Sequence, residues 1–282
     1  MLSRRRFLSI ASALAASASL PLSVMTATAS RPSPFRLVAG TTLISDILSD
    51  LLPDASILTL AQGSSCPIHS DMKSSDAFAA SDADMILIHG FQSKFPAVKA
   101  LLTTADHPGI RLVKLDVAGN WMTPPVQKKA VEAIAQALSN GYPSNATAIE
   151  GRMRTRLASI DAVSLEIERT LAGLKGLPVM ASSRQADFLT WAGLDVKAAY
   201  LTAQDLNPLE LIRLVRLGRE TGVRAVIDNR QSGADLGGAL AAELKVPHIT
   251  LSNFPMPGTP DATFFTLLRT SLHQLSTLSA GV

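Results

Sequence analysis

The 282-residue sequence contains a single cysteine, Cys66, and therefore cannot form an intramolecular disulfide. Charged residues make up 17% of the chain and aromatic residues 5%, against 47% hydrophobic residues. The fold must therefore be held by a packed apolar core without cross-links. The length suffices for one large domain or for two lobes that each have a core.

Several motifs that carry enzyme chemistry are absent. The chain has no HExxH or CxxC motif, no Ser-His-Asp order and no nucleotide-binding glycine loop. Gly218 and the Gly237-Gly238 pair fall in expected helices, whereas a phosphate loop follows a strand. Cys66 with His69 is the one candidate nucleophile and base, and no third group that would orient the base is identifiable. We therefore do not expect an enzyme.

The first 29 residues have the pattern of an export signal. A basic start precedes a short apolar run, and Ala27-Thr28-Ala29 suits a signal peptidase. Arg4 and Arg5, followed by Phe7 and Leu8, resemble a twin-arginine signal, and an ordinary Sec signal is the alternative. The apolar run is shorter than the roughly 20 residues that span a membrane. We expect residues 1–29 to be removed and the mature protein to be periplasmic.

Without this segment the chain is close to electrically neutral. The whole sequence has 26 basic and 23 acidic residues, and the signal contains three arginines and no acid. The difference, 26 minus 3, leaves 23 basic residues against 23 acidic ones. A nucleic-acid partner is therefore not expected, because it requires a concentrated basic surface.

Short apolar or β-branched runs alternate with amphipathic segments along most of the remaining chain, a pattern typical of βα units. Strands are expected at 35–40, 56–61, 84–90, 110–116, 177–183, 195–201, 223–229 and 246–252. Helices are expected at 42–53, 74–83, 185–191, 208–220, 234–244 and 261–280. The shorter helix at 74–83 has Ser74 or Ser75 as its expected cap.

Strand signals disappear for about fifty residues after Asn120, where apolar residues recur at helical spacing. From Ile149 to Leu174 this spacing predicts one helix of some thirty residues, roughly 45 Å long. We therefore predict an α/β fold with two lobes of mainly parallel sheets, 30–140 and 177–282, joined by a rigid linking helix at 141–176. A ligand cleft is expected between the lobes, at the carboxyl ends of the strands.

Four segments resemble a known family. They are Pro67 to Asp76, the ADMILIHG strand, the NWMTPP segment and Ala192-Gly193-Leu194. From about Arg36 onward the chain resembles the periplasmic zinc- and manganese-binding receptors of metal ABC importers, as a divergent member. The resemblance implies a monomeric solute-binding protein that holds Zn²⁺ or Mn²⁺ between its lobes and delivers it to an inner-membrane ABC permease.

The resemblance also implies four ligand positions, of which His69 fills the first. The second falls near Gly119 and Asn120, the third near Ser182 and Ser183, and the fourth near Ser252 and Asn253. Neutral hydroxyls and amides bind Zn²⁺ or Mn²⁺ weakly, so three of the four positions depart from the family pattern. The alternative is a receptor-like module that has lost bare-ion binding and holds a chelated metal or a small organic ligand.

Other side chains could complete the site. Cys66, Asp71, His89 and Asp228 lie at or near expected strand ends that face the cleft, and thiolate and imidazole both suit zinc. The alternatives are a half-buried thiol for Cys66, backbone bonding for His69, a strand cap for His89 and a loop cap for Asp228. The remaining histidines are expected at the surface or core edge, namely His107, His248 and His273.

Overall fold

The computed structural model describes residues 35–64, 74–104, 108–200, 207–233 and 236–281, which belong to one compact unit, Ser33–Val282. The expected export signal, Cys66, His69 and Asp71 lie outside the described residues. In the part of the chain that is described, no helix is both long enough and apolar enough to cross a membrane.

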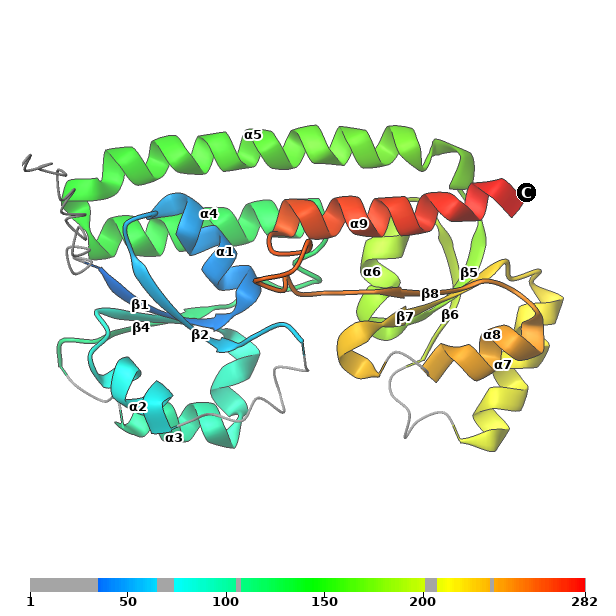
Figure 1. Cartoon of the computed structure of the whole chain (residues 1–282), viewed down its shortest axis with the longest axis horizontal. Helices are drawn as coiled ribbons and strands as arrows, with labels where there is room; N and C mark the ends of the chain where they lie inside the picture. The colour runs from blue at the N-terminus through cyan, green and yellow to red at the C-terminus, as the bar shows by residue number, and fades with distance from the viewer. Residues whose placement is uncertain (1–34, 65–73, 105–107, 201–206, 234–235, 282) are drawn as a thin grey trace, which may run out of the picture. The chain divides into compact units, whose positions relative to one another are not determined.

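The N-terminal lobe is a four-stranded parallel sheet in the order β2-β1-β3-β4 (Figure 1). Its strands are β1 (Arg36–Thr41), β2 (Ser56–Ala61), β3 (Met85–His89) and β4 (Arg111–Leu115). Its helices are α1 (Thr42–Leu51), α2 (Ser74–Ser81) and α3 (Pro96–Thr104). The sequence pattern did not predict α3, which is short and has only two buried residues, Val98 and Leu101.

The C-terminal lobe repeats this arrangement, with four parallel strands in the order β6-β5-β7-β8. Its strands are β5 (Pro178–Ser182), β6 (Asp195–Tyr200), β7 (Ala225–Asn229) and β8 (His248–Leu251). Its helices are α6 (Ser183–Trp191), α7 (Pro208–Glu220) and α8 (Leu236–Leu244). Asn207 fixes the start of α7, because its side chain accepts a hydrogen bond from the Glu210 amide at 2.9 Å and Pro208 occupies the first helical position.

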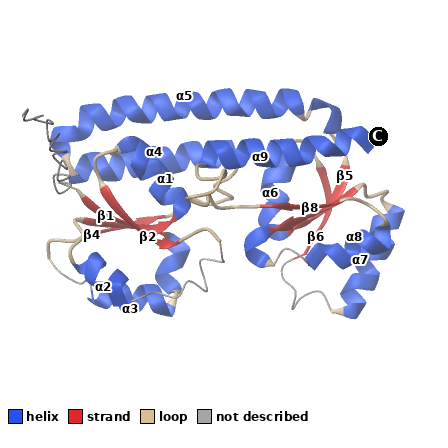
Figure 2. Ribbon diagram, viewed as in Figure 1, coloured by secondary structure: helices blue, strands red, loops and turns tan. Residues whose placement is uncertain are grey.

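Three helices form a layer on one side of the sheets: α4 (Pro124–Gly141), α5 (Ala146–Thr170) and α9 (Phe264–Ser276) (Figure 2). The long helix α5 extends over both lobes, whereas α4 lies along the N-terminal lobe. The long helix α5 has 25 residues, fewer than the thirty that the apolar spacing predicted. Compared with the expected linking helix at 141–176, α5 is shorter at both ends. Separate 3₁₀ turns precede it at Pro143–Asn145 and follow it at Ala172–Leu174, and the second turn continues the apolar spacing.

Each sheet separates two layers of helices, and the strand side chains alternate between the layers. In β3, Met85 and Leu87 belong to a large core that also includes residues of α1, α4, α5, α6 and α9. Ile86 and Ile88 face the other way, into a smaller core with α2 and α3. Val226 of β7 likewise joins the outer core of α7 and α8. The two lobes therefore share one inner core and keep separate outer cores.

A buried ion pair holds α5 against the N-terminal lobe. The Arg156 side chain is 1% exposed, and its Nη2 lies 2.6 Å from Asp46 Oδ2 of α1. Arg156 also pairs with Asp50 and lies over the Phe265 ring of α9, with Cζ 5.2 Å from the ring centroid. The same Asp46 oxygen accepts a hydrogen bond from the Phe264 amide at 3.3 Å. This cluster therefore fixes α5 and α9 to α1.

Candidate functional site

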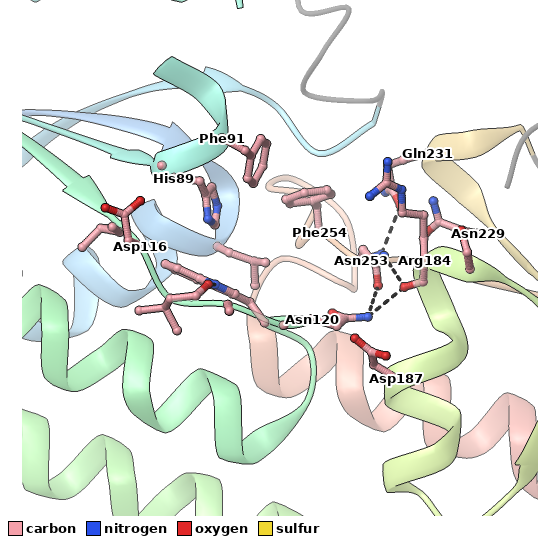
Figure 3. A pocket seen from close by; sticks show the side chains of 18 of the residues that line it. His89, Phe91, Asp116, Asn120, Arg184, Asp187, Asn229, Gln231, Asn253 and Phe254 are labelled. Atoms are coloured by element: carbon pink, nitrogen blue, oxygen red, sulfur yellow. Dashed lines mark hydrogen bonds between the residues drawn. The ribbon is translucent and has the colours of Figure 1, made fainter. Parts of the chain in front are cut away.

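A cavity of about 760 Å³ lies where the carboxyl ends of the two sheets meet. In each sheet the chain reverses its order between the two central strands, and such switch points leave a crevice at the strand ends. The N-terminal lobe contributes residues that follow β3 and β4, and the C-terminal lobe contributes the start of α6 and residues that follow β7 and β8 (Figure 3). This is the cleft position that the βα pattern predicted.

His89, the last residue of β3, lines the cavity but is only 5% exposed. Its Nε2 lies 2.9 Å from the Thr41 hydroxyl at the end of β1, and its ring packs edge-on against Trp121. Burial lowers the pKa of His89 to about 3, because desolvation penalises the charged imidazole. His89 is therefore a neutral imidazole at physiological pH.

Amide side chains form the wall of the cavity in the C-terminal lobe. Asn253 Oδ1 accepts a hydrogen bond from Gln185 at 3.2 Å, and Gln185 also donates to Asn229 at 3.0 Å. Gln231 Oε1 accepts from the Asn253 backbone amide at 3.1 Å, and Gln231 Nε2 donates to Ser252 Oγ at 2.8 Å. These polar groups satisfy one another and are held in fixed orientations.

Three hydrogen bonds continue this network into the N-terminal half of the chain. The Asn120 side-chain amide donates to the Arg184 carbonyl at 2.8 Å and to Asn253 Oδ1 at 3.2 Å (Figure 3). Gln231 Nε2 donates to the Gly63 carbonyl at 2.7 Å. Gly63 has φ +78°, and a Cβ there would lie 2.3 Å from the Pro255 carbonyl oxygen, so glycine allows this close approach. The lobes are thus hydrogen-bonded to each other.

The structure places the expected ligand positions Asn120, Ser182 and Ser252 in or beside this network. Asn120 lines the cavity. Ser182 is 1% exposed and caps α6, accepting from the Arg184 amide at 3.4 Å, while its neighbour Ser183 reaches the cavity. Ser252 is 6% exposed and donates to the Phe254 carbonyl at 3.0 Å. These three side chains are therefore engaged in holding the cavity wall.

Asp228 does not face the cleft, which corrects the expectation from its place near a strand end. It lies one residue before the end of β7, so strand alternation turns it toward α7 and α8. Its carboxylate is fully buried and accepts from Tyr200 Oη at 2.6 Å and from the Gly237 amide at 2.8 Å. His248 Nε2 lies 2.7 Å from the same carboxylate. Burial and the bond to Asp228 raise the pKa of Tyr200, which stays a neutral donor.

Among the described residues, no group of three or more His, Cys, Asp or Glu side chains lies close enough together to hold a metal ion. The acidic residues that line the cavity are Asp116, which follows β4, and Asp187 of α6. His89 is the lining imidazole, and its Nε2 already contacts Thr41. The other expected donors, Cys66, His69 and Asp71, lie outside the described residues.

Sequence reasoning missed much of the lining. Phe91, Asp116, Arg184, Asp187, Gln185 and Gln231 were not candidates, although all but Gln185 line the cavity. A usable signal was present, because polar residues follow two expected central strands directly, as Ser-Arg-Gln after β5 and Arg-Gln-Ser after β7. Residues in that position lie at the carboxyl edge of a parallel sheet, where ligands bind.

Comparison with known proteins gives one family and one fold. The model of the family described as ZnuA, zinc-uptake complex component A, periplasmic, matches residues 37–278. A crystal structure of ZnuA superposes with a TM-score of 0.74 at 16% identity, covering 86% of this chain and 98% of that chain.

Two structures of a periplasmic metal-binding protein from Candidatus Liberibacter asiaticus give similar values. Its manganese-bound and cadmium-bound forms superpose with TM-scores of 0.71 at 18% identity, covering 86% of this chain and 98% of each of those chains. The comparison with curated proteins found no match. Identities this low show a shared fold.

Proposed function

We propose, because the chain belongs to the ZnuA family of periplasmic zinc-uptake components, that it is the periplasmic receptor of an ABC importer for a transition metal. The match covers both lobes and the helices that run alongside them. The receptor would act as a monomer and deliver its cargo to an inner-membrane permease. The family is one of binding proteins, and we propose no catalytic role.

The observation that carries this proposal is the cavity between the carboxyl ends of the two sheets, lined from both lobes. A ligand there contacts both halves, so its binding and release would be coupled to their relative movement. The movement would be small, because α5 is a single 25-residue helix with no proline to bend it.

In the first form of the proposal the cargo is bare Zn²⁺ or Mn²⁺. Family membership supports this form, and His69, with Cys66, would supply the principal donors. Neutral Asn120 and the two serines, Ser182 and Ser252, would contribute weakly, since they lack charge and already take part in hydrogen bonds within the protein.

In the second form the cargo is a chelated metal or a small organic ligand. The size of the cavity favours it, because about 760 Å³ lies within the range of small-molecule sites, roughly 300–1,000 Å³. The described residues also lack a cluster of three metal-binding side chains. A chelator would bring most of the metal's donors with it, so the protein would need to recognise only the outside of the complex.

The test is elemental analysis and native mass spectrometry of mature protein purified from the periplasm, followed by thermal unfolding with added Zn²⁺ or Mn²⁺. A ligand at a hundred times its Kd stabilises a folded protein by about 2.7 kcal/mol. Bare-ion binding predicts a stoichiometric metal that is lost in His69→Ala and kept in His273→Ala, an exposed histidine on α9.

The second form predicts an additional organic mass that leaves with the metal, or without one, upon denaturation. Protein that contains neither metal nor organic ligand, and that neither ion stabilises, would refute the receptor proposal in both forms.

A further inference from the structure

Aromatic side chains line the cavity, and one of them, Phe91, is exposed to solvent. Phe91 lies in the 3₁₀ turn Gly90–Lys94 that follows β3, lines the cavity and is 48% exposed. One face of its ring stacks on His89, with centroids 5.1 Å apart and planes at 20°, and Phe95 lies at 5.8 Å. A large apolar ring that lines a cavity gains stability when a ligand covers it.

A second ring faces the same space from the other lobe. Phe254 follows β8, is partly buried and lines the cavity, as does Phe91 on the N-terminal lobe (Figure 3). Aromatic rings bind flat conjugated groups by stacking and edge contacts, and contribute little to the binding of a hydrated divalent ion. The two rings therefore favour a ligand with a flat ring.

Charged side chains of both signs line the cavity around these rings. The N-terminal lobe provides Lys94 and Asp116, and α6 of the C-terminal lobe provides Arg184 and Asp187. None of the four forms an ion pair with another residue in the part of the chain that the structure describes. Ammonium and guanidinium groups suit a carboxylate, and carboxylates suit an amine.

The neutral amide side chains of the cavity, by contrast, already form hydrogen bonds within the protein. Asn120, Asn229, Gln231 and Asn253 each bond to one another, to Gln185 or to neighbouring backbone and hydroxyl groups. A ligand that competed for them would have to break the network that joins the lobes. The charged groups are therefore the ones left to recognise its polar ends.

We propose that the cavity binds a zwitterion with a flat ring: a small compound that carries an amine and a carboxylate beside an aromatic ring, either free or as the chelate of a divalent metal. Its ring would cover Phe91 and Phe254, and its charged groups would meet Arg184, Asp187, Lys94 and Asp116. This inference rests on the second form of the proposed function and specifies its ligand class.

The test uses histidine, phenylalanine and alanine as probes, each with and without Zn²⁺, on the mature protein. Binding is followed by calorimetry and by tryptophan fluorescence, because Trp121, one of the two tryptophans, lines the cavity. Histidine and phenylalanine share the ring and the zwitterion, whereas alanine keeps only the zwitterion. We expect both ring compounds to bind at least tenfold more tightly than alanine. If the ligand binds in its free form, the affinities will be equal with and without Zn²⁺. If it binds as a metal chelate, the affinity for histidine will increase when Zn²⁺ is added.

Variants locate the site. Phe91→Ala should weaken binding of the ring compounds at least tenfold, and Phe91→Leu, which keeps apolar bulk without a flat ring, should also weaken it. Arg184→Gln removes one charge, keeps the backbone carbonyl that Asn120 contacts, and should reduce affinity about tenfold. The control is Phe78→Ala, since Phe78 is a 75% exposed phenylalanine of α2 that does not line the cavity. Thermal unfolding without ligand checks that each variant folds.

Equal binding of alanine, unchanged binding in Phe91→Ala, or failure of every probe would overturn the inference. The proposed function would survive any of these results if the purified protein contains a stoichiometric metal that is lost in His69→Ala. If the parent protein binds no ring compound and contains no metal, both the inference and the proposed function are overturned.

Discussion

The two lobes have the same strand order, yet their third strands end differently. In the N-terminal lobe, β3 ends in Ile88 and His89, and the ionisable residue lines the cavity. In the C-terminal lobe, β7 ends in Asp228 and Asn229, and the ionisable residue points into the outer core. β3 pairs with β1 in the same register in which β7 pairs with β5. When the two sheets are aligned on this pairing, Ile88 corresponds to Asp228, and His89 corresponds to Asn229. One position along a strand thus decides whether a titratable group can reach a ligand.

The comparison extends to how each lobe uses its buried charge. The N-terminal lobe uses the pair Arg156–Asp46 to hold the long helix α5, at the face of α1. The C-terminal lobe uses Asp228 to join β6, β8 and the start of α8, through Tyr200, His248 and Gly237. Buried charge is structural in both lobes, and burial keeps His89, at the edge of the cavity, neutral.

The largest effect is expected where the N-terminal lobe meets α5. Arg156→Ala should lower the free energy of unfolding by about 3–5 kcal/mol, because it leaves the buried Asp46 without its partner. Burial already raises the pKa of Asp46 and Arg156 opposes this, so the carboxyl will take up a proton more readily in the variant. Urea unfolding measures the loss.

The control for this variant lies half a turn away on the same helix. Arg154→Ala breaks an exposed pair with Glu150, in which the side chains are 63% and 59% exposed, and should cost about 0.5 kcal/mol or less. Equal effects of the two substitutions would show that the buried pair does not hold α5.

The next effect tests whether Asp228 is purely structural. Asp228→Ala should destabilise the protein by about 3 kcal/mol, since it leaves the Tyr200 hydroxyl and the Gly237 amide without their acceptor. Ligand affinity should stay unchanged, because Asp228 does not line the cavity. Calorimetric unfolding and a binding titration on the same sample separate the two quantities.

A matched control for Asp228 is Asp195→Ala, an acidic residue of the same sheet that pairs with Lys197 at the surface, where its side chain is 45% exposed. It should change stability by less than about 1 kcal/mol. If folded Asp228→Ala lost its ligand, the contrast drawn between the two strand ends would be wrong.

The effect that is smallest for a single pH unit concerns the neutral His89. The unfolded histidine has its ordinary pKa of 6.5, and the folded pKa is about 3. Between these values the unfolded chain binds a proton that the folded protein does not, so the free energy of unfolding falls as pH drops from 6.5 toward 3. The slope from this one residue is at most about 1.4 kcal/mol per pH unit.

Substitution isolates this contribution from that of the carboxylates. His89→Gln should flatten the pH dependence of stability below 6.5, whereas His273→Gln, at an exposed position of α9, should leave its shape unchanged. Urea midpoints at several pH values give the curves. A His89→Gln curve parallel to that of the parent protein would mean that His89 is charged in the folded state.

The fold could be predicted well from the sequence, because apolar runs such as Met85–Ile88 are buried in full and alternate regularly with helices. Strand bounds differed by only one or two residues. The short α3 was missed because its two buried residues give no clear periodicity.

The site was less predictable. The cleft position followed from the strand ends, but the direction of Asp228 did not. β7 ends at Asn229, as expected, and strand alternation turns the side chain one residue earlier into the outer core. The amide network could not be predicted either, because Gln185, Gln231 and Asn253 are 22 to 68 residues apart in the sequence and come into contact only when the chain is folded. Ordinary spacing rules carry no such information.

The contact between Phe264 and Asp46 has a consequence for the order of events during biosynthesis. It joins residues 218 positions apart, so the first half of the polypeptide receives one of its supports from a helix that is synthesised much later. Pairings this distant in sequence are slow to form, and the N-terminal sheet cannot reach its mature packing while translation continues. A ribosome-stalled chain that ends before Phe264 would accordingly remain sensitive to protease in its earliest-made segment.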